Sequence, residues 1–414
     1  CANCSDRRKK ANGNYRTCLR NWDMDLNKAE YKRLGNYIRE VDVRNRNLEV
    51  TKLLGVSISK EFMPSIANTI GTDMSSYKIV EPRQFAYGPV TSRNGDKVSI
   101  ALYKNDEKAI VSLAYTIFEV KNKQELLPEY LMMWFRRPEF DRYARFKSHG
   151  SAREIFSWEE MCDVELPVPP IEQQQKIVSE YEAVTRRIRL NERIIAKLEE
   201  TVQALYRKMF VDGIDKENLP EGWRMGTLGE IAEINTDNIS AKDEFKEIKY
   251  LDSSSVTQNV FDEYQIFHVL QDEIPSRAKR KVKHNDIVYS TVRPNLKHYG
   301  IIKDNIENMI VSTAFAVIRS HCSSISNELL YLMLTDDKNT EYLQGIAEMS
   351  KATYPSITPE DISALEIVIP IESVSISNVN QSIKYCFDFV YYKHRENKKL
   401  QKLQSLLLVK MEQK

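Results

Sequence analysis

A heptad spacing of mostly apolar residues constrains the fold of this chain more than any other feature. Ten positions follow one another at alternating steps of four and three residues, over more than four heptads. They are Ile177, Tyr181, Val184, Ile188, Asn191, Ile195, Leu198, Val202, Leu205 and Met209. Neither proline nor glycine interrupts residues 171–212. The spacing therefore predicts one long helix whose apolar stripe packs against another helix as a coiled coil.

The same spacing returns 202 residues later, with more polar residues in it. The second set is Val379, Ile383, Cys386, Val390, Lys393, Asn397, Leu400, Gln404, Leu407 and Met411. Two such helices in one chain predict an antiparallel pair, with Asn191 opposite Asn397 and Ile195 opposite Lys393. Polar residues in a seam reduce stability but fix the register. The alternative is that both helices belong to an ordinary helical bundle.

Short matches outside the helices recur in the same order at an offset of about 200 residues. They are Leu34-Gly35 with Leu228-Gly229, Ile110-Val111-Ser112 with Ile310-Val311-Ser312, Tyr130-Leu131-Met132 with Tyr331-Leu332-Met333, and Pro169 with Pro370. In each half, predicted strands precede a helical segment, a polar loop and a last strand that ends at proline. The sequence therefore predicts an α+β fold of two tandem mixed α/β domains, related by pseudo-twofold symmetry and separated by the antiparallel coiled coil.

The domain boundaries follow from these patterns. We predict a disordered N-terminal extension over residues 1–23, a first domain over 24–170, a central helix over 171–212, a second domain over 213–370 and a C-terminal helix over 371–414.

The composition indicates a globular protein without a dominant charge. Hydrophobic residues make up 42% of the 414 residues and charged residues 29%, but the net charge is only +1. Any surface that attracts nucleic acid therefore has to be local. There is no apolar run of 18 residues to cross a membrane and no apolar segment of a secretory signal near the start. We expect a cytoplasmic protein.

Sequence motifs for metal binding and catalysis are missing. Cys1, Cys4 and Cys18 resemble part of a zinc knuckle, but a fourth ligand is lacking because the first histidine is His149. The phosphate-binding G-x-x-x-x-G-K-[ST], the dinucleotide-binding G-x-G-x-x-G and the zinc-binding H-E-x-x-H are all absent. We therefore expect a chain without catalytic residues or a metal site. A nuclease site assembled from distant carboxylates is the alternative.

Two polar clusters recur in both halves and suit contacts with nucleic acid. The first follows a predicted strand and contains Tyr87, Arg93, Asn94 and Lys97 in the first half and Tyr289, Arg293, Asn295 and Lys297 in the second. Arginine can donate two hydrogen bonds to guanine, and asparagine can pair with adenine. Tyrosine can reach phosphates or stack on bases. The alternative is a solvated turn, because Asn94-Gly95 is a common turn dipeptide.

The second cluster follows the predicted helical segment. It contains Arg145, Lys147, His149, Ser151 and Arg153 in the first half and Lys351, Thr353 and Tyr354 in the second, and a further basic run adds Lys279 and Arg280. Local basic stretches of this kind bind phosphates by releasing counterions. The alternative is a charged face that contacts only solvent.

The junctions between domains and helices resemble a known family. "LPVPPIEQQQKIV" enters the first long helix, "KLEETVQALYRKMF" closes it, and "LPEGWRMGTLGEIAEI" opens the second domain. With these motifs the chain resembles the specificity (HsdS-type) subunit of type I restriction-modification enzymes, from about Asp25 to Met411. The second junction, "IPIESVSISNVNQSI", lacks the Pro-Pro and the glutamine triple, which places the start of its helix nearer Asn378.

The resemblance implies a function and a set of partners. Each globular domain would be a target-recognition domain that reads one half of a bipartite DNA site, and the coiled coil would set the spacer. The partners would be double-stranded DNA, two methyltransferase (M) subunits and, where the complex also cleaves, two restriction (R) subunits. S-adenosylmethionine, ATP and Mg would bind those subunits, and no cofactor would bind this chain. A coiled-coil tether without DNA binding and a self-contained nuclease are the alternatives.

Overall fold

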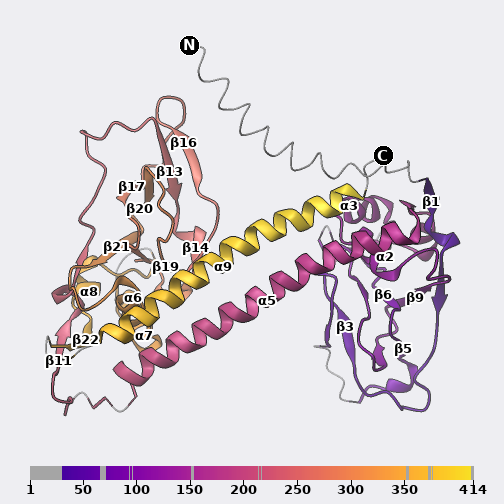
Figure 1. Ribbon diagram of the computed structural model, residues 1–414, viewed down its shortest axis with the longest axis horizontal. Helices are drawn as coiled ribbons and strands as arrows, with labels where there is room; N and C mark the ends of the chain where they lie inside the picture. The colour runs from indigo at the N-terminus through magenta and orange to yellow at the C-terminus, as the bar shows by residue number, and fades with distance from the viewer. Residues whose placement is uncertain are drawn as a thin grey trace. The chain divides into compact units, whose positions relative to one another are not determined.

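The computed structural model describes residues 30–65, 71–92, 94–95, 97–150, 153–212, 214–215, 217–350, 354–371, 374 and 376–411 (Figure 1). The predictions for residues 1–23, including the three cysteines, lie outside the described residues. The chain forms two compact units. The first ends at Ile188 and resumes at Lys399, and the second is Arg189–Lys398. Because this division crosses both long helices, each unit contains a globular part and one stretch of each helix.

The first unit is built on antiparallel strands. Its four-stranded sheet has the order β2 (Ile38–Val41), β9 (Thr116–Val120), β6 (Phe85–Tyr87) and β7 (Ile100–Leu102). Three two-stranded ladders complete it: β1 (Tyr31–Arg33) with β10 (Glu165–Pro167), β3 (Leu54–Val56) with β4 (Phe62–Pro64), and β5 (Lys78–Val80) with β8 (Ala109–Val111). Its short helices are η1 (Leu34–Asn36), η2 (Met74–Ser76), α2 (Pro128–Phe135), α3 (Pro138–Lys147) and α4 (Trp158–Cys162).

Aromatic side chains and the long helices share the core of this unit. The rings of Phe85 and Phe118 stack with their centroids 4.7 Å apart, and Phe135 of α2 meets Phe85 edge-on at 5.8 Å. The same apolar cluster includes Tyr181 of the first long helix and Leu408 of the second. Both helices are therefore anchored in the core by apolar burial, the dominant favourable term in folding.

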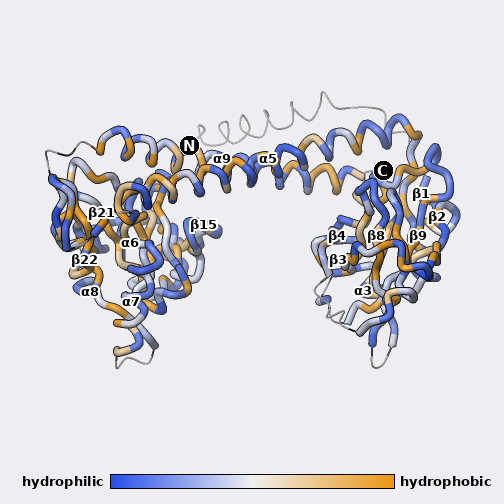
Figure 2. The backbone as a smooth tube through the Cα atoms, turned by 90° about the horizontal axis from the view of Figure 1, so that it is seen from below, coloured by the Kyte–Doolittle hydropathy of each residue, from blue (hydrophilic) through white to orange (hydrophobic). Residues whose placement is uncertain are grey.

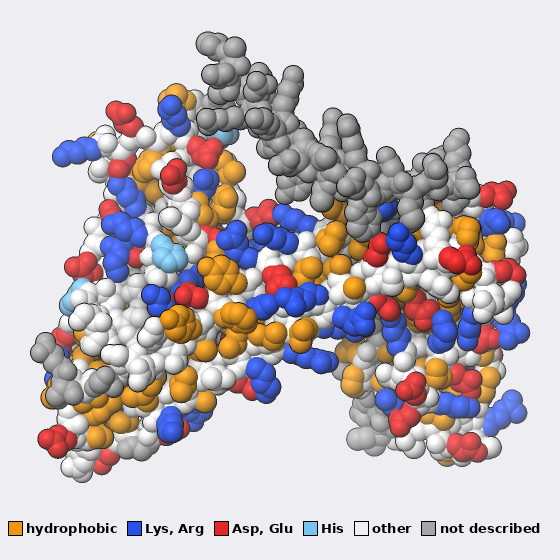
Figure 3. All heavy atoms as spheres, viewed as in Figure 1, with side chains coloured by type: hydrophobic (Ala, Val, Ile, Leu, Met, Phe, Trp, Pro, Cys, Tyr) orange, Lys and Arg blue, Asp and Glu red, His pale blue; other side chains and the backbone are white. Residues whose placement is uncertain are grey.

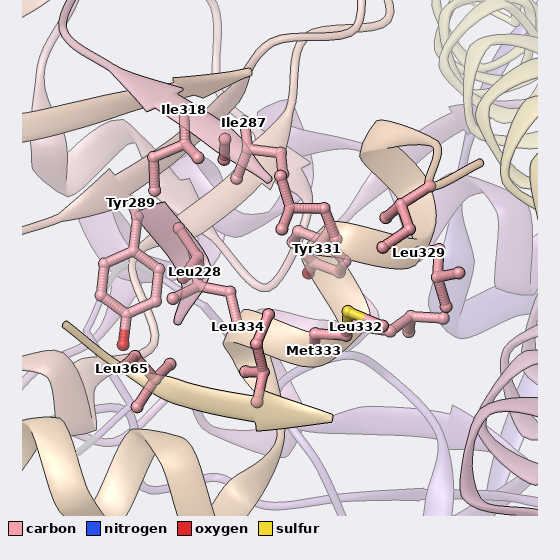
Figure 4. Close-up of a cluster of buried hydrophobic side chains, with 14 of the residues drawn as sticks. Leu228, Ile287, Tyr289, Ile318, Leu329, Tyr331, Leu332, Met333, Leu334 and Leu365 are labelled. Carbon is pink, nitrogen blue, oxygen red and sulfur yellow. The ribbon is translucent and has the colours of Figure 1, made fainter. Parts of the chain in front are cut away.

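The second unit repeats this plan with longer strands. One sheet has the order β12 (Ala232–Ile234), β21 (Phe315–Ser320), β18 (Ile287–Ser290) and β19 (Tyr299–Ile301), and another β16 (Gln265–His268), β13 (Glu247–Leu251), β20 (Met309–Ser312) and β17 (Ala278–Lys281). Two ladders pair β11 (Trp223–Thr227) with β22 (Glu366–Pro370) and β14 (Val256–Thr257) with β15 (Val260–Phe261). The helices are η3 (Leu228–Glu230), η4 (Ser253–Ser255), η5 (Pro294–Leu296), α6 (Asn327–Thr335), α7 (Asp337–Met349) and α8 (Pro359–Ser363). Figure 4 shows part of its core.

The predicted repeat is confirmed at the level of topology. The sheet β2-β9-β6-β7 corresponds to β12-β21-β18-β19, and the ladder β1-β10 corresponds to β11-β22. The repeated Leu-Gly pair opens η1 and η3. A Cβ added at Gly35 would lie 2.8 Å from Cys162 Cβ, and one at Gly229 would lie 2.1 Å from Ser363 Oγ. Glycine therefore recurs because η1 and η3 pack closely against α4 and α8.

The helical segment of each half is divided in two. Pro138 disfavours a helical conformation for the residue before it, and Arg137 is extended, with ψ of 138°. In the second unit Asp336 separates α6 from α7, and its side chain accepts a hydrogen bond from the Lys338 backbone N–H. The continuous segments expected from the apolar spacing are thus two short helices in each unit.

The two long helices are α5 (Ile171–Phe210) and α9 (Ser377–Lys410). Every predicted seam position is buried or partly buried, and apolar and polar residues alternate along both helices in Figure 2. In the second unit Asn191 Nδ2 donates to Asn397 Oδ1 at 2.8 Å. In the first, Gln404 Nε2 donates to Thr185 Oγ1 at 2.8 Å. The antiparallel coiled coil and its predicted register are confirmed, and an ordinary bundle is not supported.

The buried asparagine pair gives a test of the register. We expect Asn191→Leu to lower the free energy of unfolding by about 1–3 kcal/mol, because it leaves the Asn397 amide buried without its partner. The double change Asn191→Leu with Asn397→Leu is expected to be more stable than the wild type, because both polar groups are then replaced by apolar ones. Urea unfolding followed by circular dichroism checks both. A single variant as stable as the double variant would contradict the pairing.

No helix among the described residues combines the length and the apolar content needed to cross a bilayer.

Candidate nucleic-acid interface

In the first unit the structure brings the two predicted clusters together. The first cluster lies in the β6–β7 loop, residues 88–99, and the second in the α3–α4 loop, residues 148–157. The Thr91 backbone N–H donates to the Glu154 carbonyl at 2.9 Å, and Thr91 Oγ1 donates to Ser148 Oγ at 2.9 Å. Asn94 Nδ2 donates to the Val90 carbonyl at 3.2 Å. Two segments about 60 residues apart therefore form one surface.

The second unit pairs the corresponding loops. The β18–β19 loop, residues 291–298, meets the α7–α8 loop, residues 350–358. The Arg293 backbone N–H donates to the Pro355 carbonyl at 3.0 Å, and the Ile357 N–H donates to the Thr291 carbonyl at 2.9 Å. The Arg293 guanidinium lies 5.3 Å from the centroid of the exposed Tyr354 ring. A paired-loop surface is thus part of the repeat.

The β18–β19 loop holds two non-glycine residues in the left-handed region. Arg293 has φ of 48° and Lys297 φ of 55°, on either side of η5. Such conformations are costly and occur often at binding sites. Asn295 is exposed, and its backbone N–H donates to Gln344 Oε1 at 3.1 Å. Lys297 Nζ donates to Asp337 at 2.9 Å, which raises the pKa of the lysine.

The structure corrects the prediction that Tyr87 and Tyr289 contact nucleic acid. Tyr87 and Tyr289 are both 0% exposed, and Figure 4 shows Tyr289 among apolar side chains of the core. Burial raises the pKa of both phenols. Because each tyrosine lies on a strand buried on both faces, its ring supports the sheet that carries the loop and cannot reach DNA in this conformation.

The cations of the α3 end are largely paired. Arg145 forms an ion pair with Glu154, and Lys147 Nζ lies 3.3 Å from Glu160. The exposed His149 lies 3.9 Å from the same Glu160 carboxylate. Arg153 and Lys97 are exposed. The predictions for Arg93, Ser151, Lys351 and Thr353 lie outside the described residues.

Lys279 and Arg280 belong to β17, in the other sheet of the second unit, and not to the paired loops. Lys279 is exposed. Arg280 is half-buried, Nη1 donates to Asn238 Oδ1 at 3.2 Å, and burial lowers the pKa of its guanidinium. The Arg280 side chain is therefore bound within its own unit, where it stabilises the structure around β17. Lys279 is the exposed cation of this run.

A cavity of about 740 Å³ beside α3 was missed at the sequence level. Cations and one carboxylate line it: Lys60, Lys97, Arg136, Arg142, Arg145 and Asp141. Phe146 also lines it, together with Tyr181 and Leu408 of the long helices. The basic spacing along α3 was visible in the sequence. Lys60 gave no signal, because it comes from a loop about 75 residues earlier in the chain. On the face drawn in Figure 3, basic side chains are interspersed with acidic ones.

Within the described ranges, no group of three or more His, Cys, Asp or Glu side chains is arranged to hold a metal ion.

Comparison with known proteins decides the family. The family model described as "Type I restriction modification DNA specificity domain" matches residues 62–200 and again 220–404. The chain belongs to this family. The first match takes in most of one globular region and the second takes in the other, each with most of the long helix that follows, so the domain occurs twice in this chain.

A curated relative and a solved structure are similar to this family member. The "Type I restriction enzyme HindI specificity subunit" of Haemophilus influenzae is 32% identical over 151 residues, 36% of this chain. The match spans only 32% of that relative's length. The crystal structure of the "Type-I restriction-modification system S subunit from M. genitalium" is 11% identical, covers 94% of this chain and 97% of its own, and has a TM-score of 0.62. This similarity shows that the fold is shared.

Proposed function

We propose that the chain is the DNA sequence-specificity subunit of a type I restriction-modification complex. The two equivalent paired-loop surfaces carry the proposal, because two similar binding surfaces in one chain suit a DNA target with two halves. Family membership over both halves supports it. In this proposal residues 24–170 and 213–370 are the target-recognition domains, and the coiled coil sets the spacer between the half-sites.

The exposed polar residues of the paired loops are the proposed DNA contacts. In the second domain they are Arg293, Asn295 and Tyr354, and in the first Lys97, His149 and Arg153 together with the partly exposed Asn94. Arginine and asparagine can each make two hydrogen bonds to a base edge, while lysine neutralises phosphate. Three further cations, Arg145, Lys147 and Lys297, each form an ion pair with a carboxylate. In the proposed complex each leaves its carboxylate and contacts a DNA phosphate instead.

The proposed partners supply the chemistry. Two methyltransferase subunits bind S-adenosylmethionine and methylate adenine, and two restriction subunits use ATP and Mg where the complex also cleaves. This chain binds none of these cofactors, performs no catalysis and works in the cytoplasm. Its contribution is to position the partners on one sequence.

Methylome sequencing tests the proposal. A strain that expresses this chain with its neighbouring methyltransferase is expected to show a split motif, methylated on an adenine in each half. Removal of this chain should abolish the methylation. Exchange of residues 25–165 for those of another family member should change one half of the motif only. Identical methylomes with and without the chain would favour a tether, and methylation or cleavage by the purified chain alone would favour an enzyme.

A further inference from the structure

Two large apolar side chains are almost fully exposed at corresponding places in the two units. Phe146 is 81% exposed and Met349 is 82% exposed. Phe146 lies in the last turn of α3, and Met349 ends α7. Both helices stop at a serine: the backbone N–H groups of Ser148 and Ser350 donate to carbonyls of the last turn. The exposure therefore recurs with the repeat, although the two side chains differ in type and by one position relative to the cap.

A single exposed apolar residue is common and carries no information by itself. These two precede the loops that form the paired-loop surfaces, within three residues of their first polar positions. Phe146 also lines the cavity beside α3. Both side chains lie next to a paired-loop surface, and this position recurs in the two units. These two properties distinguish Phe146 and Met349 from scattered exposed apolar residues such as Leu113.

Cations surround Phe146 in the first unit. Arg142 lies one helical turn before it, Arg136 caps α2, and Lys97 comes from the β6–β7 loop. Among the described residues, Lys97 Nζ has no ion-pair partner. Arg142 Nη2 lies 2.9 Å from a Glu139 carboxylate oxygen in an exposed pair. Exposed pairs of this kind are weak, so phosphate can replace the carboxylate.

A buried ion pair holds the helix that presents Phe146. Lys60 Nζ donates to Asp141 Oδ1 at 2.8 Å, and the Val98 backbone N–H donates to the same oxygen at 3.1 Å. Both side chains are nearly inaccessible, and burial lowers the pKa of Lys60. The ion pair connects α3 to the loop between β3 and β4, and the Val98 hydrogen bond connects α3 to the segment that leads into β7. Phe146 therefore projects from a fixed helix, as an inserting side chain requires.

We propose that Phe146 is an apolar wedge that inserts at a base step of the first half-site, while Lys97, Arg136 and Arg142 hold the neighbouring phosphates. The proposal rests on the proposed function and adds a mode of contact to it. Exposed phenylalanine and methionine side chains can unstack a base step and bend the duplex, and the energy comes from the extra protein surface that the bent DNA meets. Met349 has the same role at the second half-site. Duplex DNA is the occupant because the cavity that Phe146 lines is also lined by five cations and one carboxylate.

The test uses the complex of this chain with its methyltransferase subunits. The probe is a duplex carrying the split motif from methylome sequencing, with 2-aminopurine placed singly at purines of the first half-site other than the methylated adenine. Binding of the wild-type complex should raise the fluorescence at one step, where the base loses its stacking. Phe146→Ala should remove this rise and increase the dissociation constant roughly tenfold, the usual cost of one lost aromatic contact with a base.

Matched variants separate a wedge from a folding defect. Phe146→Leu should keep most of the rise, because leucine also unstacks bases. Leu113→Ala removes a 48% exposed side chain elsewhere in the first unit and should change nothing. On a second set of duplexes with 2-aminopurine in the second half-site, the wild-type complex should again raise the fluorescence at one step, and Met349→Ala should remove that rise while leaving the rise in the first half-site unchanged. An undiminished rise in Phe146→Ala overturns the wedge while DNA recognition stands, whereas absence of any methylated motif overturns the proposed function and the wedge with it.

Discussion

Deletion of one heptad from each long helix is expected to change the spacer that the complex accepts, or to abolish recognition. Residues 184–190 of α5 and 398–404 of α9 face each other in the register set by Asn191 and Asn397. Their joint removal keeps the seam in phase and deletes Thr185 together with its partner Gln404. Seven residues of helix span about 10 Å, which corresponds to roughly three base pairs of DNA.

The deletion should act on the spacing and not on the reading of bases. Methylome sequencing is expected to show both half-sites unchanged with a shorter spacer. Loss of all methylation is expected if the altered twist between the half-sites cannot be accommodated. Arg186→Gln changes an exposed position of the same heptad without changing its length, and should retain the original motif. Methylation of the original motif with its original spacer by the deletion variant would show that the coiled coil does not set the distance.

The long helices could be predicted almost completely from the sequence. A seam at 3.5-residue spacing is a local property, since each position depends only on its neighbours along one helix. The 202-residue offset then determined which residues of α5 and α9 face each other, and the Asn191–Asn397 hydrogen bond follows directly. The division into α2 and α3 was also visible in principle, because Pro138 disfavours helix at Arg137.

The candidate site was harder to predict because it depends on contacts between distant segments. The sequence of each loop, that of Asn94 and that of His149, is also that of a solvated segment, and the contacts that join them, the Val90–Ile155 bridge and the hydrogen bonds of Thr91, are between residues more than 50 positions apart. Alternation of side chains along a strand did not reveal that Tyr87 is buried, because β6 is buried on both faces. A strand covered on both sides has no polar face to indicate which residues reach solvent.

Phe146 is the reverse case of Tyr87, because its sequence context indicates burial and its side chain is exposed. An apolar residue in an amphipathic helix is expected to face the core, and the exposure of this one depends on where α3 ends and on what covers it. Lys60 and Asp141 likewise gave no signal, because their partnership is between a loop and a helix 81 positions apart. Such features become visible only when the packing of the whole unit is known.

Corresponding lysines clamp the long helices in the two units, but in different surroundings. Lys104 follows β7 by two residues and binds Glu182 of α5 at 2.8 Å, with side chains 58% and 41% exposed. Lys303 follows β19 by two residues and binds Asp388 of α9 at 2.8 Å. It also binds Glu328 of α6, and these two side chains are only 4% and 2% exposed. The same position in the repeat therefore holds one solvated ion pair and one buried cluster.

Replacement of the buried lysine is expected to have far the larger effect. Lys303→Met leaves the Glu328 carboxylate buried without a counter-charge, and should lower the free energy of unfolding of the second unit by about 3–5 kcal/mol. Lys104→Met removes an exposed pair and should cost the first unit about 0–1 kcal/mol. Hydrogen exchange resolved by peptide measures the two units separately, with protection of α6 and β19 as the readout for the second. Lys303→Met combined with Glu328→Met should recover most of the loss, because no buried charge then lacks a partner. Equal losses of unfolding free energy from Lys303→Met and Lys104→Met would mean that burial of the Lys303 ion pair does not determine how much it stabilises its unit.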